Sequence, residues 1–92
     1  MVAIERLSEE TQTLASELEH KLMVLYGTPI IAGEDLVKAM GYRSIHSLRK
    51  HIYDNTFPIE LITTPGRRGK FALVRDVAIW LAEQKTFSQQ RG

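Results

Sequence analysis

The stretch Thr63-Thr64-Pro65-Gly66-Arg67-Arg68-Gly69-Lys70-Phe71 holds two adjacent arginines between two glycines. Glycine adopts positive φ angles at little cost, so this pair of glycines favours a tight turn. Apolar residues alternate along the chain before the turn, in residues 59–63, and again after it, in residues 71–73. The pattern predicts a two-stranded β-hairpin whose turn, residues 65–69, keeps both arginines out of the core.

A second basic segment lies upstream and has the period of a helix. Ser44 is a typical N-cap residue, and the helix is expected to end near Asp54. One inner face is formed by apolar residues spaced three and four apart, which are Ile45, Leu48 and Ile52. At about 100° per residue, the outer face carries Arg43, His46, Ser47 and Lys50.

Two further helices are expected before this segment. The first covers residues 8–26, begins at the N-cap Ser8 and ends at Gly27. Its apolar residues form a single stripe of leucines, namely Leu7, Leu14, Leu18, Leu22 and Leu25. The second covers residues 34–40 and also ends at a glycine, and residues 30–31 form at most a short extended piece between the two.

The last expected helix begins at Arg75-Asp76, and its inward residues are Val77, Trp80 and Leu81. Asp76 either caps this helix or pairs with Arg75. From Thr86 onward the chain is polar, so residues 86–92 are expected to form a frayed tail. The spacing of the aromatic residues favours packing over base stacking for Tyr42, Phe57, Phe71 and Trp80.

The chain of 92 residues has the size of one small domain, and its 25% of charged residues is ordinary for a globular protein. It contains no cysteine, which excludes disulfides and thiolate metal sites. No apolar run reaches the roughly 20 residues that span a membrane, and no signal peptide is expected, so the sequence predicts a cytoplasmic protein. The histidines, acids and glycines match no catalytic, metal-binding or nucleotide-binding motif. We therefore expect no enzyme activity, cofactor, metal ion, membrane partner or small-molecule ligand.

The net charge of +1 hides an uneven distribution along the chain. Residues 1–35 contain two Lys/Arg against seven Asp/Glu, a net charge of −5. Residues 36–92 contain ten Lys/Arg against four Asp/Glu, a net charge of +6. A phosphate backbone would be repelled by the first part and attracted by the second.

The order of these elements resembles the excisionase-type, MerR-like winged helix-turn-helix over residues 33–84. That family has a short helix, a glycine turn, a recognition helix, a Phe-Pro entry into a wing and a last helix that ends in Trp-Leu. The corresponding segments here are 35–42, 44–51, Phe57-Pro58-Ile59 and 75–81. More narrowly, Leu22-Met23-Val24-Leu25-Tyr26-Gly27 followed by Pro29-Ile30-Ile31 is similar to the start of pyocin activator (PrtN-like) proteins.

The resemblance implies an α+β fold, a small and mostly helical winged helix-turn-helix with one two-stranded hairpin as the wing and an extra N-terminal helix. Residues 1–31 would then form the N-terminal helix and connector, residues 32–85 the DNA-binding domain and residues 86–92 the tail. It also implies a setting in a phage or mobile element. Here the recognition helix begins Tyr-Arg-Ser-Ile-His, whereas the family more often has a serine-threonine start.

Both basic elements suit double-stranded DNA as the partner. A helix at 44–54 fits the major groove, where arginine bridges guanine O6 and N7, and arginines on a tight turn at 65–70 enter the minor groove or clamp phosphates. Arg49 lies near the edge of the apolar stripe, where a phosphate contact or an internal ion pair is as reasonable as base readout. The expected DNA-binding residues are Arg43, Ser44, His46, Ser47, Arg49, Lys50, Arg67, Arg68 and Lys70.

The sequence leaves three functions open. The chain can be a sequence-specific transcription regulator or an excisionase-like architectural factor that bends DNA, since both use the same module. It can also be an adaptor that docks a partner through the leucine stripe of residues 8–26. For the DNA-binding interpretations, the same stripe predicts a homodimer that reads two half-sites, unless it packs on its own domain.

Overall fold

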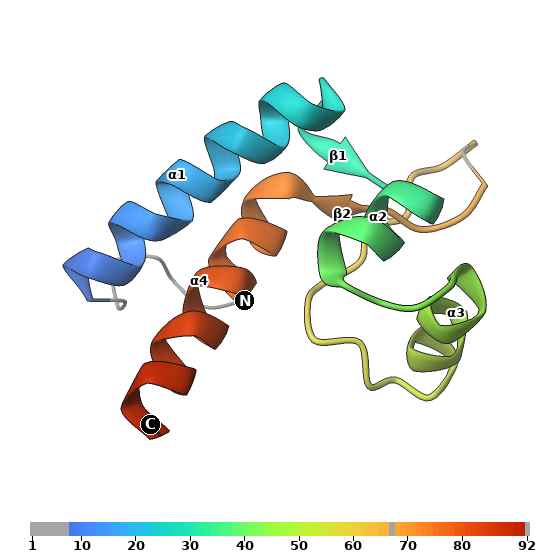
Figure 1. The fold of residues 1–92 in the computed structure, drawn as a ribbon. Helices are drawn as coiled ribbons and strands as arrows, with labels where there is room; N and C mark the ends of the chain where they lie inside the picture. Colours follow the sequence, from blue (N-terminus) through green and yellow to red (C-terminus); the bar gives the residue numbers. More distant parts are fainter. Residues whose placement is uncertain (1–7, 67, 92) are drawn as a thin grey trace.

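The computed structural model describes residues 8–66 and 68–91 (Figure 1). In chain order, the elements of this part are α1 (Glu9–Tyr26), β1 (Ile30–Ile31), α2 (Gly33–Met40), α3 (Ile45–Tyr53), β2 (Ala72–Leu73) and α4 (Val74–Arg91). Across these described residues, four helices and one two-stranded antiparallel sheet make an α+β fold. None of the helices in this part combines the length and the apolar character that crossing a membrane requires.

Capping bonds confirm the predicted starts of the first and third helices. The Ser8 hydroxyl accepts a hydrogen bond from the Thr11 N–H at 3.2 Å, and α1 begins at the next residue. Ser44 caps α3 in the same way and accepts from the Ser47 N–H at 3.2 Å. Each serine therefore satisfies a backbone donor that the first helical turn leaves without a partner.

The turn between α2 and α3 depends on Gly41. This residue has φ 80° and ψ 20°, a left-handed conformation in which a side chain is strained. Its N–H donates to the Lys38 carbonyl at 3.3 Å, and the Tyr42 N–H donates to the Val37 carbonyl at 3.0 Å. These two bonds form a Schellman motif, which ends α2 and reverses the chain toward α3.

The sheet differs from the predicted hairpin. Residues 59–63 do not pair with residues 71–73 as a ladder, and only Ile62 and Phe71 form a bridge, with N···O distances of 2.8 and 3.1 Å. The partner of β2 is instead β1, in the register Ile30 to Leu73 and Ile31 to Ala72. Pro58 and Pro65 bracket the upstream arm and lack the N–H groups that a longer ladder needs. The pairing with β1 is extended instead by the Val74 N–H, which donates to the Pro29 carbonyl at 2.8 Å. The two-stranded sheet is thus not the hairpin itself.

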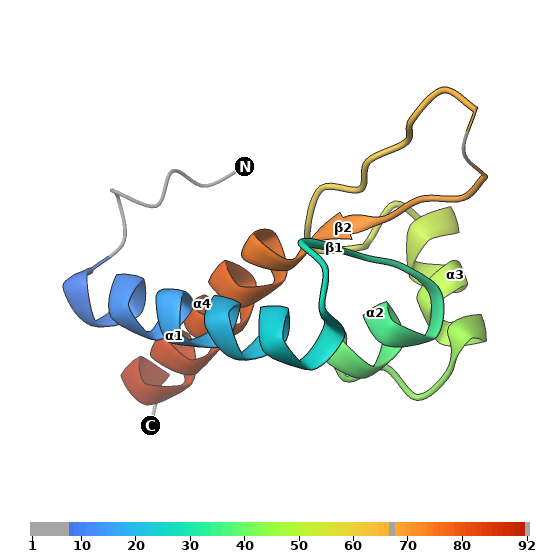
Figure 2. The same cartoon turned by 90° about the horizontal axis from the view of Figure 1, so that it is seen from above.

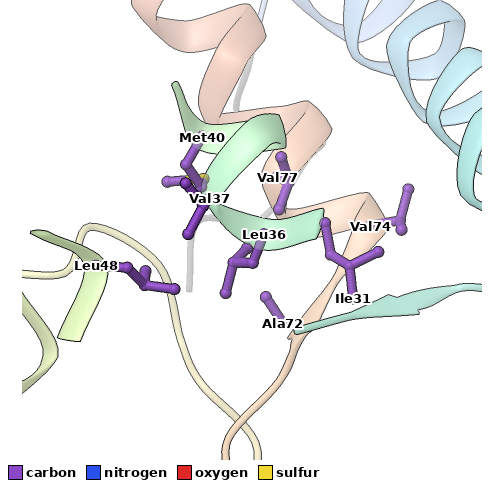
Figure 3. Packing of buried hydrophobic residues seen from close by; sticks show 8 residues of the cluster. All are labelled: Ile31, Leu36, Val37, Met40, Leu48, Ala72, Val74 and Val77. Carbon is purple, nitrogen blue, oxygen red and sulfur yellow. The ribbon is translucent and has the colours of Figure 1, made fainter. Parts of the chain in front are cut away.

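The first half of α4 is the centre of the core. Val74, Val77, Ala78 and Ala82 are fully buried there. Figure 3 shows how residues from α2, α3 and both strands converge on this helix. The cluster comprises Ile31, Leu36, Val37, Met40, Leu48, Ala72, Val74 and Val77. The predicted inward residues of the last helix are therefore buried at Val77 and half-buried at Trp80 and Leu81.

The N-terminal helix lies along α4 in the opposite direction (Figures 1 and 2). Leu14 and Leu18 pack against a small cluster made of Ala15, Ile79 and Ala82. The leucine stripe is therefore used largely within its own chain, with Leu22 packed against the main core. Leu25 is 70% exposed, and Leu7 lies outside the described residues.

The last helix also continues beyond the point where the sequence suggested a frayed tail. It runs to Arg91, five residues past Thr86. The Thr86 hydroxyl donates to the Ala82 carbonyl at 3.1 Å and lies 2.7 Å from the Thr11 hydroxyl of α1. Because α1 provides a neighbour along this part of α4, polar composition alone does not end the helix.

Burial in the core predicts a large difference between two leucines. Leu36 is 1% exposed and sits under α4, so Leu36→Ala should lower the free energy of unfolding by about 2–5 kcal/mol. In protein dilute enough to be monomeric, Leu25→Ala, at a 70% exposed position, should change it by less than about 0.5 kcal/mol. Urea denaturation followed by circular dichroism measures both, and similar losses for the two variants would contradict this core.

Candidate nucleic-acid interface

The outer face of α3 carries His46 and Lys50, as the helical period predicted, whereas Ser47, which was assigned to the same face, is half-buried. Arg49, expected near the edge of the apolar stripe, is exposed as well. Leu48 is buried on the opposite face, with Ile45 and Ile52 half-buried beside it. Arg43 is also exposed, but it lies in the turn before the helix rather than within it.

The two serines at the start of α3 differ in what they can offer. Ser44 is exposed, and its oxygen accepts the capping bond while its hydroxyl hydrogen remains able to donate. Ser47 is half-buried, and its backbone N–H is the donor in that bond. Ser44 therefore presents a donor beside the positive end of the α3 dipole, where anions are favoured.

A stack of three rings holds α3 against the rest of the fold. Tyr42 stacks on His51 with a centroid distance of 5.0 Å and meets Phe57 at 6.1 Å. Sequence analysis assigned Tyr42 and Phe57 to packing but did not connect His51 with them. His51 is half-buried, and its Nδ1 lies 2.8 Å from the Thr56 hydroxyl. Burial in this stack raises the pKa of the Tyr42 phenol.

The chain reversal after α3 brings Phe57 to Tyr42. Asn55 has φ 57°, which asparagine tolerates better than most residues with a side chain. The Thr56 N–H donates to the His51 carbonyl at 2.9 Å, and the Asn55 N–H donates to the Ile52 carbonyl at 3.2 Å. This is a second Schellman motif, and it fixes the exit of the chain from α3.

The second basic element is the 63–70 loop, which the Ile62–Phe71 bridge closes at its base. Arg68 and Lys70 are exposed on it, whereas Arg67 lies outside the described residues. Gly66 and Gly69 have φ values of 81° and 80°, as the predicted tight turn requires. A hollow of about 230 Å³ lies between this loop and the start of the sheet, lined by Thr28, Ile30, Ile31, Ala32, Arg68, Lys70 and Phe71.

Both basic elements lie at the same end of the molecule, away from the paired helices α1 and α4 (Figures 1 and 2). In the described part of the chain, none of their exposed cations forms an ion pair; these cations are Arg43, Arg49, Lys50, Arg68 and Lys70. Glu9, Glu10 and Glu17 are exposed on α1. These three acids are thus separated in space from the two basic elements, whereas Glu34 and Asp35 are exposed on α2. The cations of α3 and of the 63–70 loop remain able to attract an anion.

One residue of this end was missed by the sequence analysis. Tyr53 is 90% exposed in the last turn of α3. It follows Lys50 by three residues and His46 by seven, so it shares the outer face of the helix. The helical period is the sequence signal that identifies Tyr53, because its side chain carries no charge that would mark it as a DNA contact. A phenol at this place can donate to a phosphate oxygen.

Comparison with protein-family models, with curated proteins and with solved structures finds no match to this chain. The assignment of this surface as a nucleic-acid interface therefore depends on the geometry and charge of the surface itself.

The ring stack generates a prediction about α3. Among the described residues, no hydrogen bond involves the Tyr42 hydroxyl, so Tyr42→Phe should leave the free energy of unfolding within about 0.5 kcal/mol of the parent. Tyr42→Ala removes the ring that His51 and Phe57 contact and should cost about 2–3 kcal/mol. Chemical denaturation measures the loss, and amide hydrogen exchange should increase most in α3. Equal stability of the two variants would mean that the stack does not hold this helix.

Proposed function

We propose that this protein is a sequence-specific double-stranded DNA-binding protein that acts as a transcription regulator and is built as a winged helix-turn-helix. The observation that carries the proposal is the set of exposed cations on α3 and the 63–70 loop, which have no ion-pair partners in the described part of the chain. Free cations gathered at one end suit a polyanion, because each phosphate contact releases a counterion from the DNA.

The α2–α3 pair supports the helix-turn-helix part of the proposal. Residues 41–44 join the two helices, and this length and its glycine are typical of that motif. In such a motif the second helix enters the major groove, where base edges distinguish all four base pairs. In this proposal α3 is the reading helix, with Arg43 and Lys50 contacting bases or phosphates and Ser44 donating to a phosphate.

The 63–70 loop supports the wing. Its two glycines leave no bulk at the turn, and Arg68 and Lys70 extend from a base closed by the Ile62–Phe71 bridge. Basic side chains on such a loop can clamp phosphates or enter a narrow minor groove. Arg67, which the sequence assigns to the same turn, would add a further cation.

The wing proposal predicts a specific loss of affinity. Arg68→Ala with Lys70→Ala should weaken binding to a selected 20-base-pair duplex at least tenfold, about 1.4 kcal/mol. It should also lower the slope of log K against log salt by roughly two, since each lost phosphate contact accounts for about 0.9. The melting temperature should stay nearly unchanged, because neither side chain is buried. Fluorescence anisotropy over a series of salt concentrations measures both quantities.

A charge-matched control separates local contact from net charge. Lys21→Ala with Lys85→Ala removes two exposed cations from α1 and α4 and should leave affinity and salt slope close to the parent. If both double variants weaken binding equally, the 63–70 loop makes no particular contact. If neither changes binding, the loop is not a wing.

We also propose that the protein binds DNA as a homodimer, with two half-sites about one helical turn apart. Because Leu14, Leu18 and Leu22 pack within the chain, the contact between copies would use the exposed end of α1. Val24 and Leu25 are 72% and 70% exposed there. Adjacent exposed apolar side chains of this size are typical of a contact surface.

Light scattering tests the dimer. The parent should be dimeric at tens of micromolar, and Leu25→Glu should be monomeric with the same circular dichroism spectrum. Ser16→Glu adds the same charge at another exposed position of α1 and should remain dimeric. A monomeric parent protein would refute the homodimer but would leave the DNA-binding proposal unaffected.

A further inference from the structure

A second feature lies on α4 and on the segment that follows α3, and DNA binding does not use it. Figure 1 shows this segment running back from α3 toward the start of α4. Between them is a hollow of about 180 Å³, lined by Pro58, Ile59, Glu60, Asp76, Ile79, Trp80 and Glu83. Its wall combines three carboxylates with an indole ring and aliphatic side chains.

Asp76 is the unusual member of this wall. It is 9% exposed, and no hydrogen bond or ion pair reaches its carboxylate within the described part of the chain. The sequence predicts a cap or a pair with Arg75, but neither bond is formed among the described residues. Burial raises the pKa of Asp76, the nearby Glu60 carboxylate raises it further, and Arg75 lowers it. Solvent in the hollow reaches the Asp76 oxygens, since no fully buried side-chain oxygen in the described part of the chain lacks a partner. A cation in the hollow would offset both the partial desolvation of Asp76 and its repulsion from Glu60.

The side chains that line the hollow indicate which kind of cation it would bind. Among the described residues, no three acidic or histidine side chains are arranged to hold a metal ion. A guanidinium group is larger and planar. It can donate to carboxylates on more than one side while it stacks on an indole such as Trp80.

We propose that this hollow is a docking site for one arginine side chain of a partner protein. Its volume of about 180 Å³ is below the range of about 300–1,000 Å³ that is usual for pockets that enclose a whole ligand. It accommodates the end of one side chain, while the rest of the partner stays outside against the exposed rim at Pro58 and Glu60. The aliphatic stem of the arginine would pack on Ile59 and Trp80.

Trp80 is the only tryptophan of the chain, so its fluorescence reports on the hollow directly. The probe is a capped pentapeptide with one central arginine flanked by serine and glycine. It should change the fluorescence saturably, as expected for binding at one site. The same peptide with neutral citrulline should cause no saturable change. Asp76→Asn and Glu60→Gln should each weaken the arginine peptide at least fivefold, whereas Glu34→Gln, an exposed acid on α2, should not.

Several results would overturn the proposal. Equal binding of the arginine and citrulline peptides would show that charge is not recognised. Parent-like affinity in both Asp76→Asn and Glu60→Gln would place the peptide elsewhere. Methylguanidinium binding as tightly as the peptide would assign the hollow to a free small cation, and loss of self-association in Glu60→Gln would assign it to a second copy of this chain. Because the readout involves no DNA, the result is independent of the DNA-binding proposal.

Discussion

The burial of the first half of α4 is the constraint on which the rest of the molecule depends. Val74 and Val77 are fully buried there, so every neighbouring element must complement a surface that has no room to adjust. Leu36 of α2 packs beneath this surface, and the short strand at residues 72–73 leads directly into it. The α3 helix is then positioned from α2, by the turn at Gly41 and by the Tyr42 ring stack.

Because the core consists of apolar side chains, the fold positions the cations on the surface but does not depend on them for its own stability. The buried side chains of α2, α3 and α4 face one another, and Arg49, Lys50, Arg68 and Lys70 are left on the outside. Since these cations contribute no ion pair to the described part of the chain, a polyanion can engage them without breaking existing bonds. The proposed arginine site has the opposite character, because carboxylates line its hollow and Asp76 forms no hydrogen bond or ion pair within the described part of the chain.

Much of this fold could be predicted from local sequence signals. The predictions that were wrong concern features that depend on residues far apart in the sequence. Ser44 and Gly41 act within one turn of their own position, so a single sequence predicts them well. The partners of residues 72 and 73 lie 41 and 43 residues upstream in β1, and no local pattern distinguishes β1 from the nearer arm at 59–63. The extension of α4 past Thr86 depends on α1 in the same way.

The candidate site also combines features that local sequence patterns predict with features that they do not. The exposed positions of α3 follow from its period, which predicted Lys50 and could also have found Tyr53. The Tyr42–His51 contact needs the chain reversal at Asn55, and the hollow around Asp76 needs two segments to meet, so neither can be read from the sequence.

The most direct test of the central claim is a titration of isotope-labelled protein with a short DNA duplex, followed by amide chemical shifts. The account predicts that the shifts change along α3 and the 63–70 loop and stay constant in the paired part of α1 and α4. Changes confined to α1 and α4, or no change at low salt, would contradict it.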